Sequence, residues 1–251
     1  MLIKHSADVS AQDDNGTTPL HLALSFREAE VAAMLIERGA DVTAQNKDGW
    51  TPLHLASKNG QVEVAGMLIE HSADVAAQNE DGTTPLHVAL ADGRTEVAVM
   101  LIERGADTTP HKYGWTPLHL ASLNGQVEPA SMLIERGADV TAQNNDGLTP
   151  LHLAADVRAQ YNDFSLTQLQ THLASHAGHV EVIAMLVENG ADVTAQNNDG
   201  STPLHLALQE GGLEVAGMLI GQYPDNLPYY CMLFLFWPLL PNANLCAMQS
   251  L

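Results

Sequence analysis

The chain has 251 residues, and its 30 acidic residues against 10 lysine and arginine residues give a formal net charge of −20. So acidic a surface repels phosphate backbones and anionic lipids, which argues against nucleic acid and membrane surfaces as partners. The charge favours a neutral or basic protein as the partner instead.

The two cysteines, Cys231 and Cys246, both lie in the carboxy-terminal segment 221–251. No disulfide framework therefore supports the rest of the chain, which agrees with a reducing compartment and predicts a cytoplasmic or nuclear protein. Residues 1–9 lack the basic start, apolar run and small-residue cleavage site of a signal peptide.

A six-residue phrase, Thr-Pro-Leu-His-Leu-Ala or a one-letter variant of it, is written six times along the chain. Its threonines are Thr18, Thr51, Thr84, Thr116, Thr149 and Thr202. They are 33, 33, 32, 33 and 53 residues apart, so a period of 33 holds except for one deleted residue and one insertion of 20. Such a period indicates a repeat array instead of a single closed domain.

Each copy of the phrase predicts the start of a helix. The Thr51 hydroxyl can cap the helix, and Pro52 suits the first helical position, where a missing N–H costs nothing. Leu53 and Ala56 are three residues apart and therefore share one face, where the small alanine lets a second helix approach closely.

The phrase at this period resembles the signature of the ankyrin repeat family, Thr-Pro-Leu-His-x-Ala every 33 residues. Around Thr51 the resemblance extends to Asp48-Gly49 before the phrase and to Gly60 after it. It covers residues 1–220 and implies an all-α repeat solenoid of stacked ankyrin helix-turn-helix units with β-hairpin loops. It also implies that the phrase histidine bonds the phrase threonine and neighbouring backbone.

We divide the array into the units 13–45, 46–78, 79–110, 111–143, 144–196 with a 20-residue insert at 155–174, and the incomplete unit 197–220. Residues 1–12 align with the end of a unit and are interpreted as the remnant of a truncated ankyrin repeat, so we expect a piece of a longer array. The apolar tail 221–251 is interrupted by prolines, whereas a membrane helix needs roughly 20 apolar residues. We therefore interpret the tail as a cap or a mistranslated end in preference to a membrane anchor.

Four departures from the pattern predict local differences. Arg27 stands where glycine is expected between the two helices, which predicts a rearranged loop or an extended helix. Ser72 replaces the glycine that closes the other second helices, at a modest local cost. The hairpin before Trp115 is one residue shorter and has Tyr113 in place of aspartate, so it should differ in shape from its neighbours. Pro129 falls in the first turn of its helix, where a missing N–H is tolerated.

The insert 155–174 interrupts the fifth unit between its first helix and the following turn. Leu166, Leu169 and Leu173 are spaced to share one helical face, which predicts a loop followed by a short extra helix.

Three histidines outside the phrase raise the question of a metal site. His172 and His176 are four residues apart, as in a helical zinc site, and His179 follows them. No cysteine or close carboxylate pair completes a ligand set, so we expect no metal and no cofactor. A metal-responsive module using His172 and His176 stays the weaker hypothesis.

The other polar patterns do not support an enzyme. One glutamate recurs at the start of the second helices, where it interacts favourably with the helix dipole. These residues are Glu30, Glu63, Glu96, Glu128, Glu181 and Glu214. Acid–base catalysis would need a unique pair in a cleft, and no phosphate-binding glycine loop, nucleophile elbow or kinase signature is present.

A partner-binding surface is predicted from aromatic residues at positions that do not repeat. The family resemblance implies that hairpin tips and first-helix ends form a concave recognition surface, and four aromatic residues map onto it. Tryptophan and tyrosine are also enriched at binding hot spots. The predicted partner-binding residues are Phe26, Lys47, Trp50, Lys58, Asn59, Lys112, Tyr113, Trp115, Leu123 and Asn124. The alternative is that Trp50 and Trp115 only cover neighbouring hairpins.

The sequence thus predicts a protein–protein interaction scaffold that binds another protein through the concave hairpin and inner-helix face of the array. The alternative is the targeting or substrate-recognition part of a larger enzyme, such as a ubiquitin-ligase receptor or an ankyrin-bearing kinase or acyltransferase.

Overall fold

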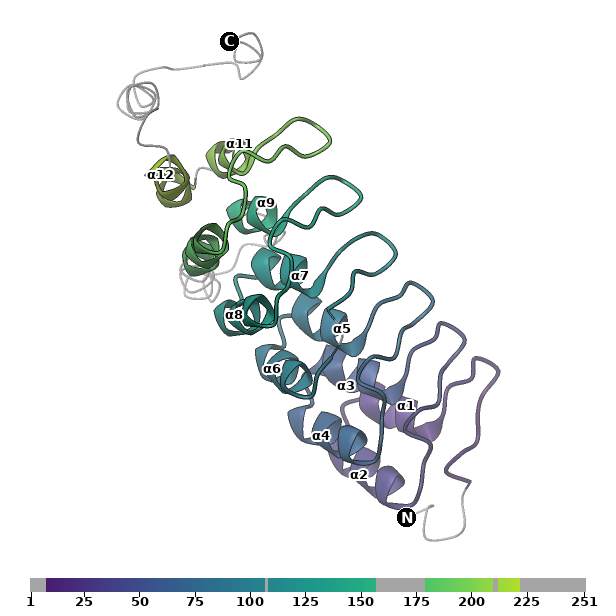
Figure 1. Cartoon of the computed structure of the whole chain (residues 1–251). Coiled ribbons are helices and arrows are strands. Elements are labelled where there is room, and N and C mark those ends of the chain that lie inside the picture. Colours follow the sequence, from purple (N-terminus) through teal and green to yellow (C-terminus); the bar gives the residue numbers. More distant parts are fainter. Residues whose placement is uncertain (1–7, 107, 157–178, 210–211, 222–251) are drawn as a thin grey trace, which may run out of the picture.

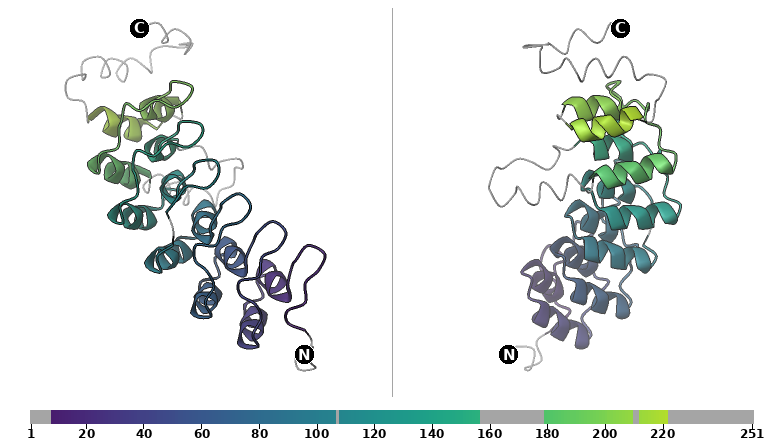
Figure 2. Two further views of the ribbon diagram at one scale, coloured as in Figure 1. Left: turned by 45° about the vertical axis from the view of Figure 1, so that its right-hand side comes forward. Right: turned by 90° about the vertical axis from the view of Figure 1, so that its left-hand side faces the viewer.

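A computed structural model describes residues 8–106, 108–156, 179–209 and 212–221. Successive units stack side by side, and each contributes one helix to an inner row, one to an outer row and one hairpin (Figure 1). The turned views show the same two helix rows with the hairpins along one side (Figure 2). This arrangement confirms the predicted all-α repeat solenoid. No described residue is assigned to a β-strand, so the hairpins are built from turns.

The inner helices begin at the proline of each phrase. They are α1 (Pro19–Ser25), α3 (Pro52–Asn59), α5 (Pro85–Ala91), α7 (Pro117–Leu123), α9 (Pro150–Ala155) and α11 (Pro203–Gln209). The outer helices are α2 (Ala29–Glu37), α4 (Val62–Glu70), α6 (Thr95–Glu103), α8 (Val127–Glu135) and α12 (Leu213–Gly221). Residues 179–188 are also helical and form the outer helix of the fifth unit.

The phrase threonine and histidine cap each inner helix and join it to the next unit. In α3 the Thr51 backbone N–H donates to His54 Nδ1 at 3.2 Å, and the His54 backbone N–H donates to Thr51 Oγ1 at 3.4 Å. Because Nδ1 accepts, the ring hydrogen lies on Nε2, which donates to the Thr83 carbonyl of the following hairpin at 2.9 Å. This geometry confirms the structural role expected for the phrase histidine.

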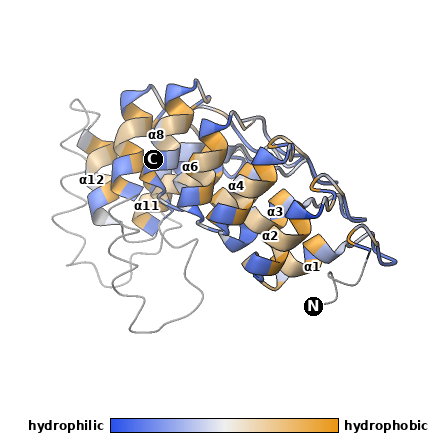
Figure 3. Cartoon of the chain, turned by 90° about the horizontal axis from the view of Figure 1, so that it is seen from below, coloured by the Kyte–Doolittle hydropathy of each residue, from blue (hydrophilic) through white to orange (hydrophobic). Residues whose placement is uncertain are grey.

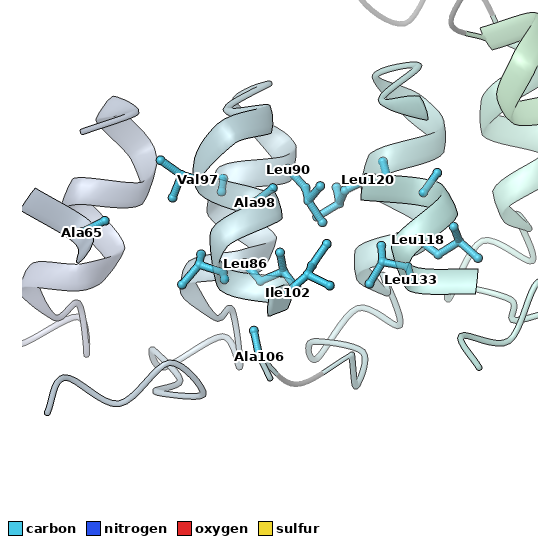
Figure 4. Close-up of a cluster of buried hydrophobic side chains, with 14 of the residues drawn as sticks. Ala65, Leu86, Leu90, Val97, Ala98, Ile102, Ala106, Leu118, Leu120 and Leu133 are labelled. Carbon is cyan, nitrogen blue, oxygen red and sulfur yellow. The ribbon is translucent and has the colours of Figure 1, made fainter. Parts of the chain in front are cut away.

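The hydrophobic core is a continuous cluster that passes through the units and is not closed within any one of them. The helices are mostly apolar in colour, with hydrophilic residues at their ends and along the hairpins (Figure 3). Between the third and fourth units the side chains of Leu90 and Leu120 approach each other, and Ile102 lies near Leu133 (Figure 4). All four are buried. Burying one such side chain contributes roughly 1.5–3 kcal/mol, so each unit is stabilised mainly by its neighbours.

Hydrogen bonds between units satisfy carbonyl groups at the ends of the inner helices, where no intrahelical partner exists. In each case a side chain of one unit donates to a carbonyl of the unit before it. The bonds run from Asn59 to Leu24, from Arg94 to Lys58, from Asn124 to Leu90 and from His179 to Leu123, at 2.9, 3.0, 2.6 and 2.9 Å. We call these four residues the inter-unit donors.

The loop at Arg27 differs from the prediction. It is not rearranged and α1 is not extended, because Arg27 adopts the left-handed conformation with φ at 60°, close to the 70° of Gly60 in the next unit. A left-handed conformation costs roughly 1–2 kcal/mol for a residue with a side chain. The bond from Arg27 Nε to Asn59 Oδ1, at 3.3 Å, offsets part of that cost. Ser72, which replaces the closing glycine, also adopts the left-handed conformation, with φ at 71°. This agrees with the modest local cost predicted for that position.

The hairpin at 111–115 was expected to differ in shape, and its tip does not. His111 N donates to Trp115 O at 3.1 Å and Gly114 N to His111 O at 2.8 Å. The second unit makes the same two bonds from Asn46 and Gly49. His111 Nδ1 accepts from Tyr113 N at 3.1 Å and so replaces the asparagine oxygen, while the missing residue precedes His111.

Pro129 is buried in the first turn of α8, as predicted. The predictions for most of the insert 155–174, for residues 1–7 and for the tail 222–251 lie outside the described residues.

Candidate partner-binding surface

A shallow pocket of about 300 Å³ opens on the hairpin and inner-helix face. It spans three consecutive units, because its lining comes from α3, α5, α7 and the hairpins that precede these three helices. The lining residues are Trp50, Lys58, Thr83, His87, Val88, Ala91, Asp92, His111 and Leu120.

The pocket exists because the middle unit has small side chains where its neighbours have large ones. Thr83 occupies the position that Trp50 and Trp115 hold in the flanking units. Ala91 likewise occupies the position of Lys58 in the second unit. The flanking units therefore provide walls, and the third unit provides the floor.

Trp50 forms one wall and is held by contacts within the second unit and with the first. Its ring centroid lies 5.5 Å from that of His54, and Lys58 Nζ lies 5.6 Å from the indole centroid. A cation over an indole face at this distance contributes roughly 0.5–1 kcal/mol at an exposed site. The Trp50 carbonyl also accepts from His21 Nε2 at 3.0 Å. Trp50 therefore faces the pocket as a preorganised, half-buried side chain.

His87 of the third unit and His111 of the fourth unit also line the pocket. The His87 ring is held by Thr84 Oγ1 at its Nδ1, at 2.8 Å, and by the Trp115 carbonyl at its Nε2, at 3.2 Å. Since both ring nitrogens are occupied, His87 offers mainly ring carbon atoms to a ligand. The His111 ring centroid lies 5.4 Å away, and burial lowers the pKa of His111 while the Asp81 carboxylate opposes that shift.

Tyr113 and Lys112 extend this surface along the hairpin tip. The Tyr113 ring is exposed and meets the His111 ring edge-on, with centroids 5.6 Å apart. Lys112 Nζ lies 5.0 Å from the Tyr113 ring centroid and forms an ion pair with Asp81. The hydrogen bond with Asp81 raises the pKa of Lys112.

The ten predicted binding residues divide into three groups. Trp50 and Lys58 line the pocket, and Lys112 and Tyr113 adjoin it through His111. The remaining six do not line it, and they are Phe26, Lys47, Asn59, Trp115, Leu123 and Asn124.

Three of those six residues have contacts that tie units together. Asn59 and Asn124 are inter-unit donors, and the Trp115 carbonyl accepts from His87. Leu123 is half-buried at the end of α7. Lys47 and Phe26 are exposed, and Phe26 lies in the first unit, two units away from Ala91 at the pocket floor.

Sequence reasoning missed most of the pocket lining, namely Thr83, His87, Val88, Ala91, His111 and Leu120. Large aromatic residues were the signal for binding, whereas the pocket results from the small Thr83 and Ala91. Comparing each unit with its two neighbours at these positions could have found it.

Of the three histidines that raised the question of a metal site, the structure describes His179. His179 is buried and its Nε2 bonds the Leu123 carbonyl, so that nitrogen has a structural role. No group of three histidine, cysteine or acidic residues placed to hold a metal occurs in the described ranges. His172 and His176 lie outside them. None of the helices that the structure describes is both long and apolar enough to cross a membrane.

Stacked helix pairs joined by hairpins, with a shallow pocket between units and a core shared by neighbouring units, define a repeat solenoid. Models of ankyrin repeats match residues 2–56, then 43–112, 72–144 and 108–164, and finally 171–220. The chain belongs to the ankyrin repeat family.

Individual relatives match short parts of the array. The chain is 38% identical over 52 residues to the NF-kappa-B inhibitor cactus of Drosophila yakuba, covering 20% of this chain and 11% of that protein. It is 37% identical over 62 residues to the probable E3 ubiquitin-protein ligase XBOS33 of Oryza sativa subsp. japonica, covering 25% and 12%. It is 34% identical over 53 residues to the putative ankyrin repeat protein FPV223 of Fowlpox virus, covering 21% and 38%. The chain thus spans about a tenth of the length of the first two.

Proposed function

We propose that the chain is a protein–protein interaction scaffold that holds its partner along the hairpin and inner-helix face of the second to fourth units. The pocket between Trp50 and His111 is the observation that carries this proposal. Its volume of about 300 Å³ is at the lower end of the range for binding pockets, which suits one large side chain of a partner. Family membership supports the same function, because ankyrin repeats generally mediate protein–protein interaction.

The anchor that best fits the pocket is an apolar side chain. The floor includes Val88 and Ala91 of the third unit, and Trp50 and Leu120 of the flanking units give apolar walls. The nitrogens of His87 are already bonded within the protein, so a polar anchor would lose its water partners without gaining new ones there. Trp50 thereby has the character of a binding hot spot, a rigid aromatic at the centre of a desolvated contact.

The proposed partner is neutral or basic, and the proposed compartment is the cytoplasm or the nucleus. A net charge of −20 favours association with positive surfaces and slows approach of acidic ones. The placement of both cysteines in segment 221–251 agrees with a reducing compartment.

The proposal is tested by filling the pocket from its floor. A photo-crosslinking residue at position 91 in the chain expressed in cells identifies the bound protein, and the same residue at the exposed Glu103 of the outer row serves as the control. For the purified pair, Ala91→Trp should weaken binding by about tenfold or more, whereas Ala91→Ser should leave it nearly unchanged. Ala91 is exposed, so both variants should melt at the wild-type temperature. Unaltered binding by Ala91→Trp would sink the proposal.

A second candidate function is the substrate-recognition part of a larger enzyme, such as a ubiquitin-ligase receptor or an ankyrin-bearing kinase or acyltransferase. One relative is named a probable E3 ubiquitin-protein ligase, and the chain covers 12% of it. The mass of the protein purified from its natural source distinguishes the two. A polypeptide much larger than 26.9 kDa that carries a further catalytic domain would favour this second candidate.

A further inference from the structure

One hairpin of the stack is closed by an imidazole where the others use an amide or carboxylate oxygen. In the second unit Asn46 Oδ1 accepts two backbone N–H groups of its own hairpin, at 3.1 and 2.8 Å. The third, fifth and sixth units have the same asparagine, and the first unit has Asp13. In the fourth unit the acceptor is His111 Nδ1, which receives the Tyr113 N–H at 3.1 Å. Of these six acceptors, all within described residues, only His111 can gain a proton near neutral pH.

A proton on this ring would remove the acceptor on which the hairpin tip depends. A neutral imidazole accepts at Nδ1 when its hydrogen lies on Nε2, whereas the charged ring donates at both nitrogens. The Tyr113 N–H would then face another N–H group instead of a lone pair. The imidazole also makes no second bond to the N–H of Trp115, whereas the N–H of Trp50 bonds Asn46 in the second unit. The tip of the fourth hairpin therefore depends on a single side-chain bond.

The surroundings of His111 favour its neutral form. The charged and titratable side chains around it are Asp81 of the preceding hairpin, Lys112 and Tyr113 of its own, His87 of α5 and His119 of α7, with Lys58 and Asp92 lining the same pocket. Asp81 is the group that would stabilise a charged ring, but it already forms an ion pair with Lys112. Burial outweighs the effect of Asp81 and lowers the pKa of His111.

The same ring lines the pocket, so its charge also affects what the pocket can hold. A neutral imidazole continues the apolar surface that Trp50, Val88 and Leu120 present to an anchor. A charged ring would have to be desolvated beneath that anchor, which costs free energy. An anchor that covers His111 therefore lowers its pKa further, and by linkage binding weakens as pH falls.

We propose that His111 is a pH-sensitive latch, which holds the hairpin tip in place and keeps the pocket apolar at neutral pH and loses both functions when its ring gains a proton. The hairpin part of this proposal stands on its own, and the pocket part rests on the proposed scaffold function. A partner bound at neutral pH would be released in mildly acidic surroundings.

The latch is tested first in the free full chain by nuclear magnetic resonance. Between pH 7.5 and 5.5 the Tyr113 amide signal should shift with the same midpoint as the His111 ring, below about pH 6.5. The Asp146 amide is the internal control and should stay nearly constant, because it donates to the Asn144 amide oxygen at 2.9 Å. The nitrogen shifts of the neutral His111 ring should place its hydrogen on Nε2.

The variant His111→Asn restores the acceptor that four of the other units use, and its Tyr113 amide should no longer titrate. Binding is measured with the protein that crosslinks through position 91. Its affinity should fall about three- to tenfold more for the wild type than for His111→Asn between pH 7.5 and 5.5, because one proton is involved. Titration of the partner itself affects both chains alike and does not enter this comparison.

Several results would overturn the proposal. In the free chain these are a Tyr113 amide that does not titrate, one that titrates equally in His111→Asn, and a ring hydrogen on Nδ1. A His111 midpoint above about pH 6.5 would also do so, because Asp81 would then stabilise the charged ring. Equal losses of affinity in both chains would assign the pH dependence of binding to other groups. Failure of the scaffold proposal, seen as unaltered binding by Ala91→Trp, leaves the free-chain signals as they are, so the two failures can be distinguished.

Discussion

Individual residues of this array are constrained mainly by backbone conformation and by bonds to the adjacent unit. Ser72 and Arg27 show that a left-handed turn persists without glycine when the surrounding stack requires it. Asn59 and Asn124, which were predicted to bind a partner, each donate a hydrogen bond to a carbonyl of the preceding unit. A polar residue at the end of an inner helix therefore does not by itself indicate a binding site.

The cost of the left-handed conformation can be measured by a reciprocal pair of substitutions. Ser72→Gly should stabilise the array by about 0.5–1 kcal/mol, because the strain of a side chain at positive φ exceeds the entropy that glycine loses. Gly39→Ser should destabilise it by a similar amount, because Gly39 has φ at 79°. A Cβ there would meet no atom within 4 Å, so no steric clash adds to the cost of the backbone conformation. Urea unfolding of both variants gives the two values. Changes of the same sign would contradict this explanation.

The helix pair is the element that folds locally but is completed by its neighbours. Each inner helix has its own cap, such as Thr51 with His54, while one carbonyl group at the far end of α1, α3, α5 and α7 accepts a bond from the next unit. The pocket also depends on neighbouring helix pairs, because a unit with small side chains at the lining positions lies between two units with large ones. Differences between neighbouring pairs, not the features that every pair shares, thus create the candidate site.

An inter-unit donor can be removed without changing the shape of its side chain. Asn124→Asp should lower the free energy of unfolding by about 1–2 kcal/mol, because the Leu90 carbonyl keeps only its bond from the Gly93 N–H and then faces a carboxylate. The matched variant Asp92→Asn restores the residue of the second and fourth units and should be neutral or stabilising. Chemical denaturation at pH 7 compares them. An Asn124→Asp protein as stable as the wild type would show that this bond adds nothing.

Buried neutral histidines occur in several units along the length of the array. Burial lowers the pKa of His21, His54, His119 and His152, and it lowers that of His119 to about 4. Bonds from the threonine two residues on lower the pKa of the Asp41, Asp139 and Asp192 carboxyls. These four capping histidines belong to the first, second, fourth and fifth units, so the stability of the array depends on pH at several places along its length.

The direction of that dependence follows from proton binding. Below about pH 6.5 the unfolded chain binds protons at these histidines that the folded chain does not, so stability falls as pH falls. Carboxyl groups with lowered pKa add a further loss only at lower pH, around and below their unfolded value of about 4. The free energy of unfolding should therefore drop by more than about 1.4 kcal/mol per pH unit between pH 6 and 5, the limit for a single group.

Urea unfolding at a series of pH values measures this slope. His119→Gln should reduce the proton uptake by up to about one proton and flatten the curve accordingly. If the free energy of unfolding of the wild type changed by less than about 1.4 kcal/mol per pH unit between pH 6 and 5, the assignment of several neutral buried histidines would be wrong.

The sequence alone determined the repeat architecture, because caps, turns and apolar spacing act within one 33-residue unit and are written out six times. It also located the row of hairpins and correctly assigned the phrase histidine. Only the tertiary structure decided which residues meet across units, because inter-unit contacts join positions about 33 residues apart whose side chains must be compared in three dimensions. Trp50, Ala91 and His111 become one pocket through the stacking of three units and not through any local pattern.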